Sequence, residues 1–382
     1  MRRESFGTYI ESATLGETVR AFVPPALPPD PPLSIPTDVQ TALDRALLTL
    51  GRLDGMVAAL PDVDLLLYTF VRKEAVLSSQ IEGTQSTLDD LLKHEMQMAP
   101  GAPEEDVREV SRYVEALNHG MTRIAGDLPL SNRLLREMHA ILLADGRGAE
   151  KQPGEFRRSQ NWIGGSRPGN AAFVPPPPDR LDDCLSNLER YLHATANPIV
   201  KVALAHLQFE TIHPFLDGNG RVGRLLISLM LHNDGVLRKP LLYPSLYFKE
   251  HRADYYAELN AVRATGDYER WVGFFAEAMR HSAQVAISTG QRITQVFDKD
   301  RQQLRAVPRM AGTLLLVQES LQAKPIATIA ALTSATHLTT PTITSALREL
   351  EDRGIVKEIT GRPRDRVFAY FRYLDALARE DE

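Results

Sequence analysis

Two apolar helical segments separated by a short polar run constrain the fold more than any other feature. The first segment is PIVKVALAHLQFETI at 198–212, and the second is RVGRLLISLMLHNDG at 221–235. Both have the length and the apolar character of packed α-helices. Between them the chain reads HPFLDGNG. We therefore expect a polar loop held in place by two apolar helices.

Most of the remaining chain also has helical periodicity, so the protein is predicted to be mainly α. Pro36-Thr37-Asp38 is a helix start signal, and Gly83 is a stop signal. Apolar residues recur at helical spacing. The predicted helical segments are 37–60, 62–83, 87–97, 104–121, 130–145, 179–194, 249–267 and 268–291.

Two stretches rich in proline or glycine interrupt the helical pattern. Residues 22–36, FVPPALPPDPPLSIP, carry too much proline for a helix or a central strand. We expect them to form an extended arm that packs on the surface through its apolar side chains. Residues 153–178 place Gly164, Gly165 and Gly169 between short β-prone pieces, which predicts a β-hairpin flap.

The chain changes character after a polar connector at 291–310. The segments 327–335 and 340–354 are predicted to be two short helices, and 355–371 contains two β-prone runs joined by a turn. Helix, helix and hairpin in this order predict a winged helix-turn-helix. The turn is basic, with Arg362, Arg364 and Arg366. Such modules bind DNA but also form dimers and dock proteins, so DNA binding and a homodimer both remain open.

Composition excludes several classes of protein. The 382 residues carry a formal net charge of −5, so non-specific nucleic-acid binding is not a property of the whole chain. One cysteine, Cys184, allows neither an intramolecular disulfide framework nor a cysteine-rich zinc site. The first residues lack the apolar run of a signal peptide, and no stretch reaches the ~18 apolar residues of a membrane span. We expect a cytoplasmic protein that has no membrane partner.

The polar loop has the residue types of a phosphate site. Glycines on both sides of Asn219 allow a tight turn, and the helix that follows directs its N-terminal N–H groups into that turn. Arg221 and Arg224 are three residues apart and share a helix face, where two guanidinium groups suit more than one phosphate. Asp217 would repel phosphate unless a magnesium ion bridges the two. His213 has a pKa suited to a general base.

The whole stretch resembles a known motif. HPFLDGNGRVGR matches the Fic-domain motif HxFx[D/E]GNGRxxR at every defined position, and the helical order from about 36 to 290 is similar to that of Fic proteins. The resemblance implies a Fic-type helical core and transfer of AMP from ATP to a Ser, Thr or Tyr hydroxyl of a target protein, with release of pyrophosphate. Family members that act as kinases replace the second glycine of GNG, which is present here as Gly220.

The resemblance also assigns roles by motif position. His213 would deprotonate the target hydroxyl, Asp217 would hold Mg²⁺, Asn219 would lie near the α-phosphate and Arg224 would meet the γ-phosphate. Phe215 would be structural. The full set predicted to bind ATP and its phosphates is Gly218, Asn219, Gly220, Arg221, Val222, Gly223, Arg224 and Tyr255, where Tyr255 would border the adenine.

A second motif lies far upstream. SSQIEG at 78–83 is similar to the inhibitory motif [S/T]xxxE[G/N] of Fic proteins, with Ser78, Glu82 and Gly83 at its defined positions. A glutamate at a helix C-terminus is unfavourable against the helix dipole, so Glu82 needs a cationic partner. Arg224 is the expected one. A pair between them would occupy the γ-phosphate fork and restrain ATP use.

The flap is predicted to align the target. Its tip residues Ile163, Gly164, Gly165 and Ser166 lie where Fic proteins hold the target backbone, and an exposed hairpin edge can do so by strand addition. The partners implied are ATP, Mg²⁺ and a hydroxyl side chain of a target protein, and self-modification is left open.

The predicted organisation has five parts. They are a proline-rich arm at 1–35, a helical region with the inhibitory motif at 36–125, the Fic core at 126–290, a connector at 291–310 and a winged helix at 311–382. Two alternatives to AMP transfer remain. One is removal of AMP at the same site, and the other is a DNA-binding regulator whose Fic core only senses nucleotide.

Overall fold

The computed structural model describes residues 6–59, 64–96, 101–362 and 364–379. It is mostly helical, as predicted. The predicted helix ends at 60, 62–63 and 97, and the first residues of the predicted arm, lie outside this described part. The helices that precede the polar loop are α1 (Thr37–Ala59), α2 (Asp64–Ile81), α3 (Leu88–Glu95), α4 (Glu104–Ala125), α5 (Asn132–Leu142), α6 (Leu181–Leu192) and α7 (Pro198–Ile212). Those that follow it are α8 (Asn219–Asn233), α9 (Ser245–Glu250), α10 (Arg252–Thr265) and α11 (Tyr268–Arg305).

Helices α7 and α8 form the centre of the core. Asn197 caps α7 by accepting hydrogen bonds from the N–H groups of Ile199 and Val200, and Pro198 occupies the first turn. Nearly every side chain of both helices is buried. The indole of Trp271 on α11 is fully buried and donates a hydrogen bond of 2.8 Å to the carbonyl of Ala203 on α7. The polar loop is therefore anchored between two helices that cannot move independently of the core.

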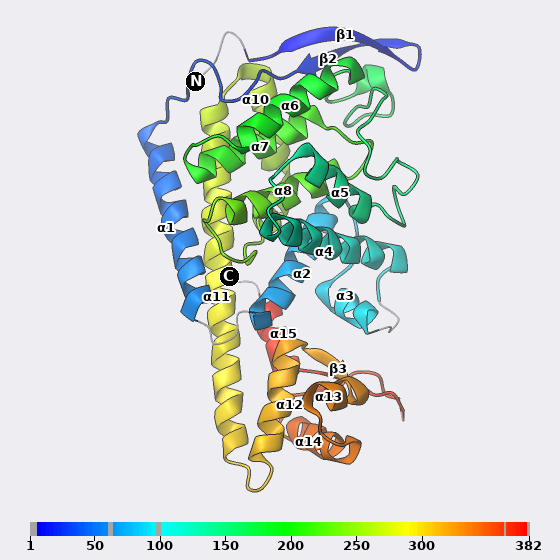
Figure 1. Ribbon diagram of the computed structural model, residues 1–382, viewed down its shortest axis with the longest axis vertical. Helices are drawn as coiled ribbons and strands as arrows, with labels where there is room; N and C mark the ends of the chain where they lie inside the picture. The colour runs from blue at the N-terminus through cyan, green and yellow to red at the C-terminus, as the bar shows by residue number, and fades with distance from the viewer. Residues whose placement is uncertain (1–5, 60–63, 97–100, 363, 380–382) are drawn as a thin grey trace.

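Helix α11 runs almost the full length of the molecule, with α1 packed along it (Figure 1). It spans 38 residues and joins the core to the C-terminal module. The polar stretch predicted as a connector at 291–310 is the last part of this helix up to Arg305 and the turn after it. Apolar side chains such as Ile293, Phe297 and Leu304 remain buried there, which explains why a charged segment stays helical. The domain boundary within it remains a prediction.

The N-terminal region differs from the expected proline-rich arm. Strands β1 (Thr8–Thr14) and β2 (Glu17–Val23) form an antiparallel hairpin before the prolines. Gly16 with φ 77° makes its tight turn. The sequence ETVRAFV has the alternation of a half-buried strand, although no strand was predicted there. The prediction that the proline segment packs on the body is confirmed, because Phe22 is buried and Leu27 packs against the core.

The flap at 153–178 has less regular structure than predicted. Its two limbs meet in a single β-bridge between Ile163 and Phe173, and a short 3₁₀ turn, Pro168–Asn170, lies between them. Proline and glycine leave too few N–H groups and too little rigidity for longer strands. The flap contacts the N-terminal hairpin, where the N–H of Phe22 donates to the carbonyl of Val174 at 2.9 Å.

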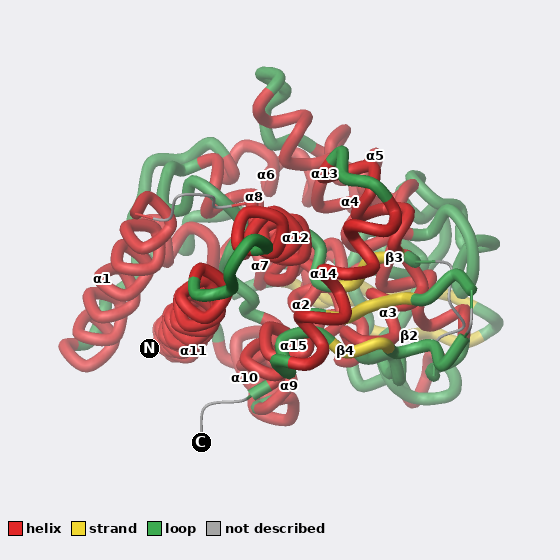
Figure 2. The backbone as a smooth tube through the Cα atoms, turned by 90° about the horizontal axis from the view of Figure 1, so that it is seen from below, coloured by secondary structure: helices red, strands yellow, loops and turns green. Residues whose placement is uncertain are grey.

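The C-terminal module has the helix, helix and hairpin order that was predicted. Helices α13 (Ile329–Thr336) and α14 (Thr340–Asp352) precede strands β4 (Lys357–Glu358) and β5 (Val367–Ala369). The sequence did not reveal three further elements, α12 (Ala311–Ala323), β3 (Ile326–Thr328) and α15 (Phe371–Ala378). The sheet has the order β3-β5-β4 with antiparallel pairs. Seen from below, α11 and α12 lie side by side (Figure 2).

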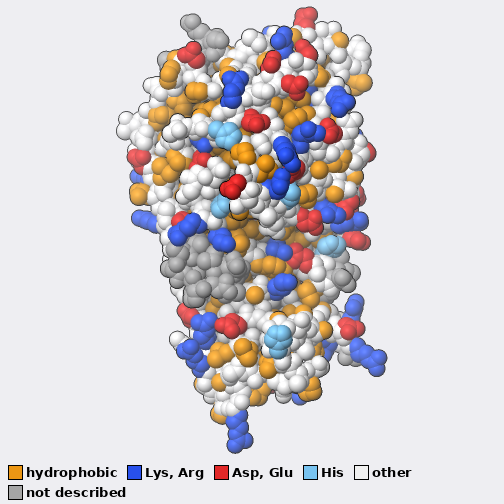
Figure 3. Space-filling view, viewed as in Figure 1, with side chains coloured by type: hydrophobic (Ala, Val, Ile, Leu, Met, Phe, Trp, Pro, Cys, Tyr) orange, Lys and Arg blue, Asp and Glu red, His pale blue; other side chains and the backbone are white. Residues whose placement is uncertain are grey.

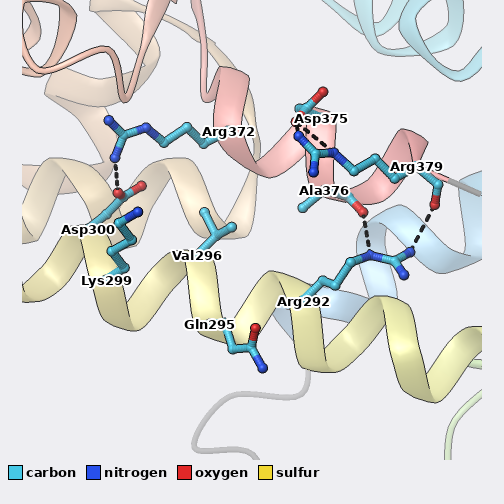
Figure 4. Close-up of a pocket in the computed structure, with 9 residues that line it drawn as sticks. All are labelled: Arg292, Gln295, Val296, Lys299, Asp300, Arg372, Asp375, Ala376 and Arg379. Carbon is cyan, nitrogen blue, oxygen red and sulfur yellow. Dashed lines mark hydrogen bonds and ion pairs between the residues drawn. The ribbon is translucent and has the colours of Figure 1, made fainter. Parts of the chain in front are cut away.

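Helix α15 returns from this module to α11 (Figure 4). Arg292 on α11 donates to the carbonyls of Ala376 and Arg379, and Arg372 pairs with the buried Asp300. These contacts surround a groove of about 400 Å³. Tyr373 of α15 also shares a hydrogen bond of 3.0 Å with Thr69 on α2. The C-terminal module is thus fastened to the helical core as well as covalently joined to it.

The surface agrees with a near-neutral chain. In the face shown in Figure 3, basic and acidic side chains are intermingled rather than gathered by sign. Within the described residues, no helix is both long enough and apolar enough to span a bilayer.

Candidate active site

The polar loop lines a pocket of about 340 Å³ at the N-terminus of α8. This pocket brings together both motifs that the sequence singled out, because Glu82 from the end of α2 lies in its wall. Its lining residues are Glu82, Arg147, His213, Leu216, Asp217, Gly218, Asn219, Gly220 and Arg221. The prediction that 78–83 and 213–224 meet, although they are far apart in sequence, therefore agrees with the structure.

His213 ends α7 in the left-handed region, with φ 49° and ψ 62°. Its N–H still bonds the carbonyl of Phe209 at 2.9 Å, so the chain turns sharply without leaving the helix unsatisfied. Burial, then the nearby charges of Arg263 and Arg157, lower the pKa of His213 to about 3. The imidazole is therefore neutral at physiological pH. Its Nδ1 is buried and has no hydrogen-bond partner among the described residues, and the His213 residue itself lines the pocket.

Asn219 holds the loop rather than presenting its amide to the pocket. Its Oδ1 accepts from the N–H of Phe215 at 2.8 Å, and its Nδ2 donates to the Phe215 carbonyl at 2.9 Å. Both amide atoms of Asn219 are thus bonded within the loop. Its predicted contact with the α-phosphate region remains a prediction. Gly218 has φ 73° and begins α8. Phe215 is fully buried, which agrees with its expected structural role.

His139 on α5 supports the same loop. Its ring stacks on Phe215 with centroids 3.7 Å apart. The N–H of Gly154 donates to Nδ1 at 2.8 Å, so Nε2 carries the proton and donates to the carbonyl of Asp217 at 3.0 Å. Burial lowers the pKa of His139 to about 4, which keeps this tautomer neutral. His139 thus contacts the polar loop at Phe215 and at Asp217, and it joins the loop to Gly154.

Asp217 projects a half-exposed carboxylate into the pocket. Its Oδ1 accepts from the N–H of Gly218 at 2.6 Å and lies 3.7 Å from the guanidinium of Arg221. A single carboxylate beside a phosphate site suits Mg²⁺, which keeps most of its coordination for water and phosphate oxygens. No cluster of three or more acidic, histidine or cysteine ligands occurs in the part of the chain that the structure describes. The residues present fit Mg²⁺ only as an ion shared with a bound phosphate.

Arg221 and Arg224 take different partners. Arg221 is buried and lies 2.9 Å from Glu109 on α4, which also contacts Arg147 at 3.2 Å. Burial raises the pKa of Glu109, although both arginines oppose that rise. The sequence did not reveal Glu109 or Arg147, because neither lies near the motif in the chain. Arg147, Glu109, Arg221 and Asp217 thus form a row of neighbouring charges that alternate in sign.

Arg224 is locked to the upstream motif. Its Nε donates to Ser78 Oγ at 2.8 Å, and its Nη2 donates to the Ser78 carbonyl at 3.0 Å and to Glu82 Oε1 at 2.6 Å. Arg224 is only 1% exposed. Burial is the largest single effect and opposes ionisation of Glu82, but the charge and hydrogen bond of Arg224, with the charge of Arg221, together hold the pKa of Glu82 below its ordinary value. The expected Glu82–Arg224 pair is present.

Gly220 leaves space for this pair, and Gly83 lets the chain turn directly after Glu82. A Cβ on Gly220 would overlap Glu82 Oε1 and approach Arg224 Nη1 to 3.0 Å. Gly83 has φ 104° and ends the inhibitory segment immediately after Glu82. A side chain at position 220 would therefore displace Glu82, whereas the left-handed turn before α8 is made by Gly218.

Four residues predicted to bind ATP do not line the pocket, and their contact with ATP remains a prediction. One is Arg224, which Ser78 and Glu82 hold, and the other three are described next. Val222 is fully buried in the core, and its N–H bonds the carbonyl of Gly218 at 3.1 Å. Gly223 faces α7, where a Cβ would overlap the carboxylate of Glu210. Tyr255 is 1% exposed. None of the three offers a side-chain surface to the pocket.

Tyr255 belongs to an aromatic cluster of the core. Its hydroxyl donates to His206 Nε2 at 2.8 Å, while His206 Nδ1 donates to the carbonyl of Gly223 at 3.0 Å. The neighbouring Tyr256 is 38% exposed. Tyr255 thus faces the core and Tyr256 the surface, which the sequence alone does not reveal for two adjacent helical residues. The contact of Tyr255 with the adenine remains a prediction.

The flap tip keeps the residues that were predicted for it. Gly164 and Gly165 have φ values of 68° and 75°, so the tip turns through conformations that favour glycine. Ser166 donates its N–H to Asn170 Oδ1 at 3.0 Å, which closes the turn. Ile163 anchors the tip through its bridge to Phe173. Gly164, Gly165 and Ser166 are exposed and open to a target segment, and whether they bind one remains a prediction.

Comparison with known proteins agrees with this geometry. Residues 40–122 match the family described as Fic/DOC family N-terminal, and residues 129–231 match the Fic/DOC family. The chain contains a Fic domain. The 213–224 motif that carried the expectation comprises the polar loop and the first part of α8, and it lies within the second match.

Relatives of known activity are similar over part of their length. The chain is 30% identical over 250 residues to a protein named protein adenylyltransferase Fic from Drosophila grimshawi, which covers 63% of this chain and 48% of that protein. It is 37% identical over 128 residues to the protein of the same name from Drosophila erecta, which covers 32% of this chain and 23% of that one. The chain thus spans about half or less of these relatives.

Two solved structures share the fold. A Fic family protein from Desulfovibrio desulfuricans G20 superposes with a TM-score of 0.59 at 19% identity over 92% of this chain and 99% of that one. Fic-1 from C. elegans superposes with a TM-score of 0.52 at 23% identity over 66% of this chain and 74% of that one. The first of these likenesses extends well beyond the Fic core.

Proposed function

We propose that the protein transfers AMP from ATP to a Ser, Thr or Tyr hydroxyl of a target protein and releases pyrophosphate. The observation that carries the proposal is one pocket in which a neutral His213, the Asp217 carboxylate and the N-terminus of α8 meet. A proton acceptor, a metal-compatible carboxylate and a phosphate cradle are the groups that nucleotidyl transfer requires. The similarity to proteins named protein adenylyltransferase supports the same activity.

The chemistry follows from the residues. The target hydroxyl gives its proton to His213 as its oxygen forms a bond to the α-phosphorus of ATP. The bond from that phosphorus to the bridging oxygen of the leaving group breaks, and pyrophosphate departs with the electron pair. Backbone N–H groups at the start of α8 stabilise the charge that builds on the phosphate oxygens. Asp217 would hold Mg²⁺ against the phosphates, where the ion neutralises their charge.

Glu82 restrains this activity in the proposal. Arg224 is the cation expected to bind the γ-phosphate, and it is held by Glu82 and Ser78. While the pair persists, the γ-phosphate must compete with an anion that is already in place. ATP then binds weakly or in an unproductive position. Displacement of Glu82 frees the guanidinium.

The test uses ATP labelled at the α- or the γ-phosphate, with wild type and with Glu82→Gly. The proposal predicts that only α-label enters protein, and that Glu82→Gly raises the incorporation. Incorporation of γ-label would identify a kinase instead. Absence of α-label with both proteins, in a lysate that supplies targets, would contradict AMP transfer.

The chain offers two other candidate functions. Glu82 lies at the pocket wall, where a carboxylate could orient a water for removal of AMP from a modified protein. Release of AMP from a pre-labelled target by wild type, lost in Glu82→Gly, would favour that reaction. The exposed Thr339 and Thr340 at the start of α14, with the exposed Arg348 farther along it, suit a DNA groove. Sequence-specific DNA binding without any AMP transfer would favour a nucleotide-sensing regulator.

A further inference from the structure

A buried arginine outside both motifs links the catalytic histidine to the flap. Arg157 lies on the incoming limb of the flap and is 2% exposed. Its guanidinium donates four hydrogen bonds to described residues, and all four go to backbone carbonyls. Burial lowers the pKa of Arg157 to about 10, so the group remains charged at neutral pH. A charge buried in this way is retained only where its environment satisfies it.

One side of the guanidinium holds the end of α7. Its Nε donates to the carbonyl of His213 at 2.9 Å, and its Nη2 donates to that of Ile212 at 3.3 Å. These are carbonyls that no later turn of the helix satisfies, and they lie at the negative end of the helix dipole. The backbone N–H of Arg157 also donates to the carbonyl of Pro214 at 2.9 Å. Arg157 therefore stabilises the left-handed turn in which His213 stands.

The other side holds both limbs of the flap. Nη2 donates to the carbonyl of Pro176 at 2.6 Å on the outgoing limb, and Nη1 donates to that of Ser159 at 3.3 Å on the incoming limb. Gln160 adds a bond of 2.9 Å from its Nε2 to the carbonyl of Pro175. Asn161 adds one of 3.1 Å from its Nδ2 to the carbonyl of Phe215. The flap base and the loop that carries the histidine are thus one hydrogen-bonded unit.

We propose that Arg157 is a positioning residue that sets the distance between a target hydroxyl aligned by the flap and the imidazole of His213. The proposal rests on the AMP transfer proposed above. The phosphate cradle lies on the far side of the turn, at the start of α8, and the four carbonyls that the Arg157 guanidinium binds do not belong to it. Loss of the link therefore affects the proton transfer and leaves nucleotide binding intact. Misplacement of reacting groups by about 1 Å costs on the order of 100-fold in rate.

The test compares Arg157→Lys with Arg158→Lys, both in the Glu82→Gly background. Lysine keeps the charge but cannot span four carbonyls with one ammonium group. Arg158 is the exposed neighbour and serves as the matched control. We expect Arg157→Lys to lower kcat for target modification by about 10- to 100-fold. The affinity and stoichiometry of ATP binding, measured by calorimetry, stay within about twofold of the background value.

The outcomes separate three cases. If the Glu82→Gly background itself transfers no AMP, the proposed function fails and Arg157 is not at issue. If the background is active and Arg157→Lys is equally active, the positioning role is refuted. A fall in ATP stoichiometry that matches the fall in kcat would indicate partial unfolding and also refute it.

A milder variant covers the case in which Arg157→Lys does not fold. Asn161→Asp removes one donor to the Phe215 carbonyl and nearly preserves the shape of the side chain. It is expected to lower kcat by about 3- to 10-fold with unchanged ATP affinity. An unchanged kcat in folded Asn161→Asp would contradict the link between flap and catalytic loop.

Discussion

If the proposed function holds, replacing Glu82 with glycine raises the rate of AMP transfer by an amount that follows from the contacts of Arg224. The pair is 2.6 Å long, Arg224 is 1% exposed and the Glu82 side chain is 30% exposed. A hydrogen bond between charged groups contributes about 1.5–3 kcal/mol, and the exposure of Glu82 places this pair in the lower half of that range. Each 1.4 kcal/mol corresponds to about tenfold in an equilibrium. The fraction of free Arg224 should therefore rise about 10- to 30-fold.

The assay is the initial rate of α-label incorporation at fixed, subsaturating ATP. We expect that rate to rise about 10- to 30-fold in Glu82→Gly, because free Arg224 governs productive ATP binding. Glu82→Gln, which keeps the size but not the charge, should give a smaller increase. Arg224 loses a partner in the apo variant, so ATP should raise the thermal midpoint more in Glu82→Gly than in wild type.

Glu95→Gly is the matched control. Glu95 pairs with Arg72 of α2 at 2.8 Å, with side chains that are 23% and 14% exposed. The change removes a comparable ion pair, which joins α3 to the middle of α2 and lies outside the pocket lining. If Glu95→Gly activates the protein as strongly as Glu82→Gly, or if Glu82→Gly changes the rate by less than about twofold, the reasoning from the Arg224 contacts is wrong.

Three further predictions follow from the buried groups. His213→Ala should lower AMP transfer by about 10²- to 10⁴-fold and leave ATP affinity within about twofold, as checked by calorimetry, because a general base acts in the transition state. Tyr255→Phe removes the bond to His206, so it should lower the free energy of unfolding by about 1 kcal/mol without changing KM for ATP. A large rise in KM for ATP would instead indicate that Tyr255 contacts the nucleotide. Burial raises the pKa of Glu210 from 4.5 to about 7, so its folded form holds a proton that the unfolded form has lost, and that stabilisation disappears as pH rises through 7. Glu210→Gln should therefore raise the thermal midpoint more at pH 8 than at pH 6, whereas the exposed Glu104→Gln should show no such difference.

The local features of the site were predictable because they lie close together in the chain. A glycine turn between two apolar helices requires a loop at a helix N-terminus, whatever surrounds it. The Glu82–Arg224 pair was predictable across a long separation because a carboxylate at a helix end needs a partner. Resemblance to a known motif then identified that partner.

The residues that the sequence did not reveal act through tertiary contacts. Arg157 and His139 bind the polar loop, and Glu109 pairs with Arg221 at the start of α8. The three come from different segments, and none belongs to a recognisable sequence motif. A charged or polar side chain that is buried can mark such a residue. The sequence does not show which side chains are buried, because burial depends on how the helices pack. The orientation of Tyr255 against Tyr256 was undetermined for the same reason.

The N-terminal hairpin shows a different limit. Strand β2 was detectable from its alternation, but β1 has exposed residues on both faces and acquires its structure by pairing with β2. Short elements such as β3 and β5, of three residues each, depend on the sheet that they complete. Long helices were predictable because their periodicity repeats over several turns.

Mass spectrometry of the modified target tests the central claim most directly. Glu82→Gly is incubated with ATP, Mg²⁺ and a cell lysate, and the peptides that gain label are sequenced. The account predicts an AMP group on a Ser, Thr or Tyr hydroxyl, and no such group when the double variant Glu82→Gly with His213→Ala is used. A phosphate adduct, or an AMP adduct that forms equally well without His213, would contradict it.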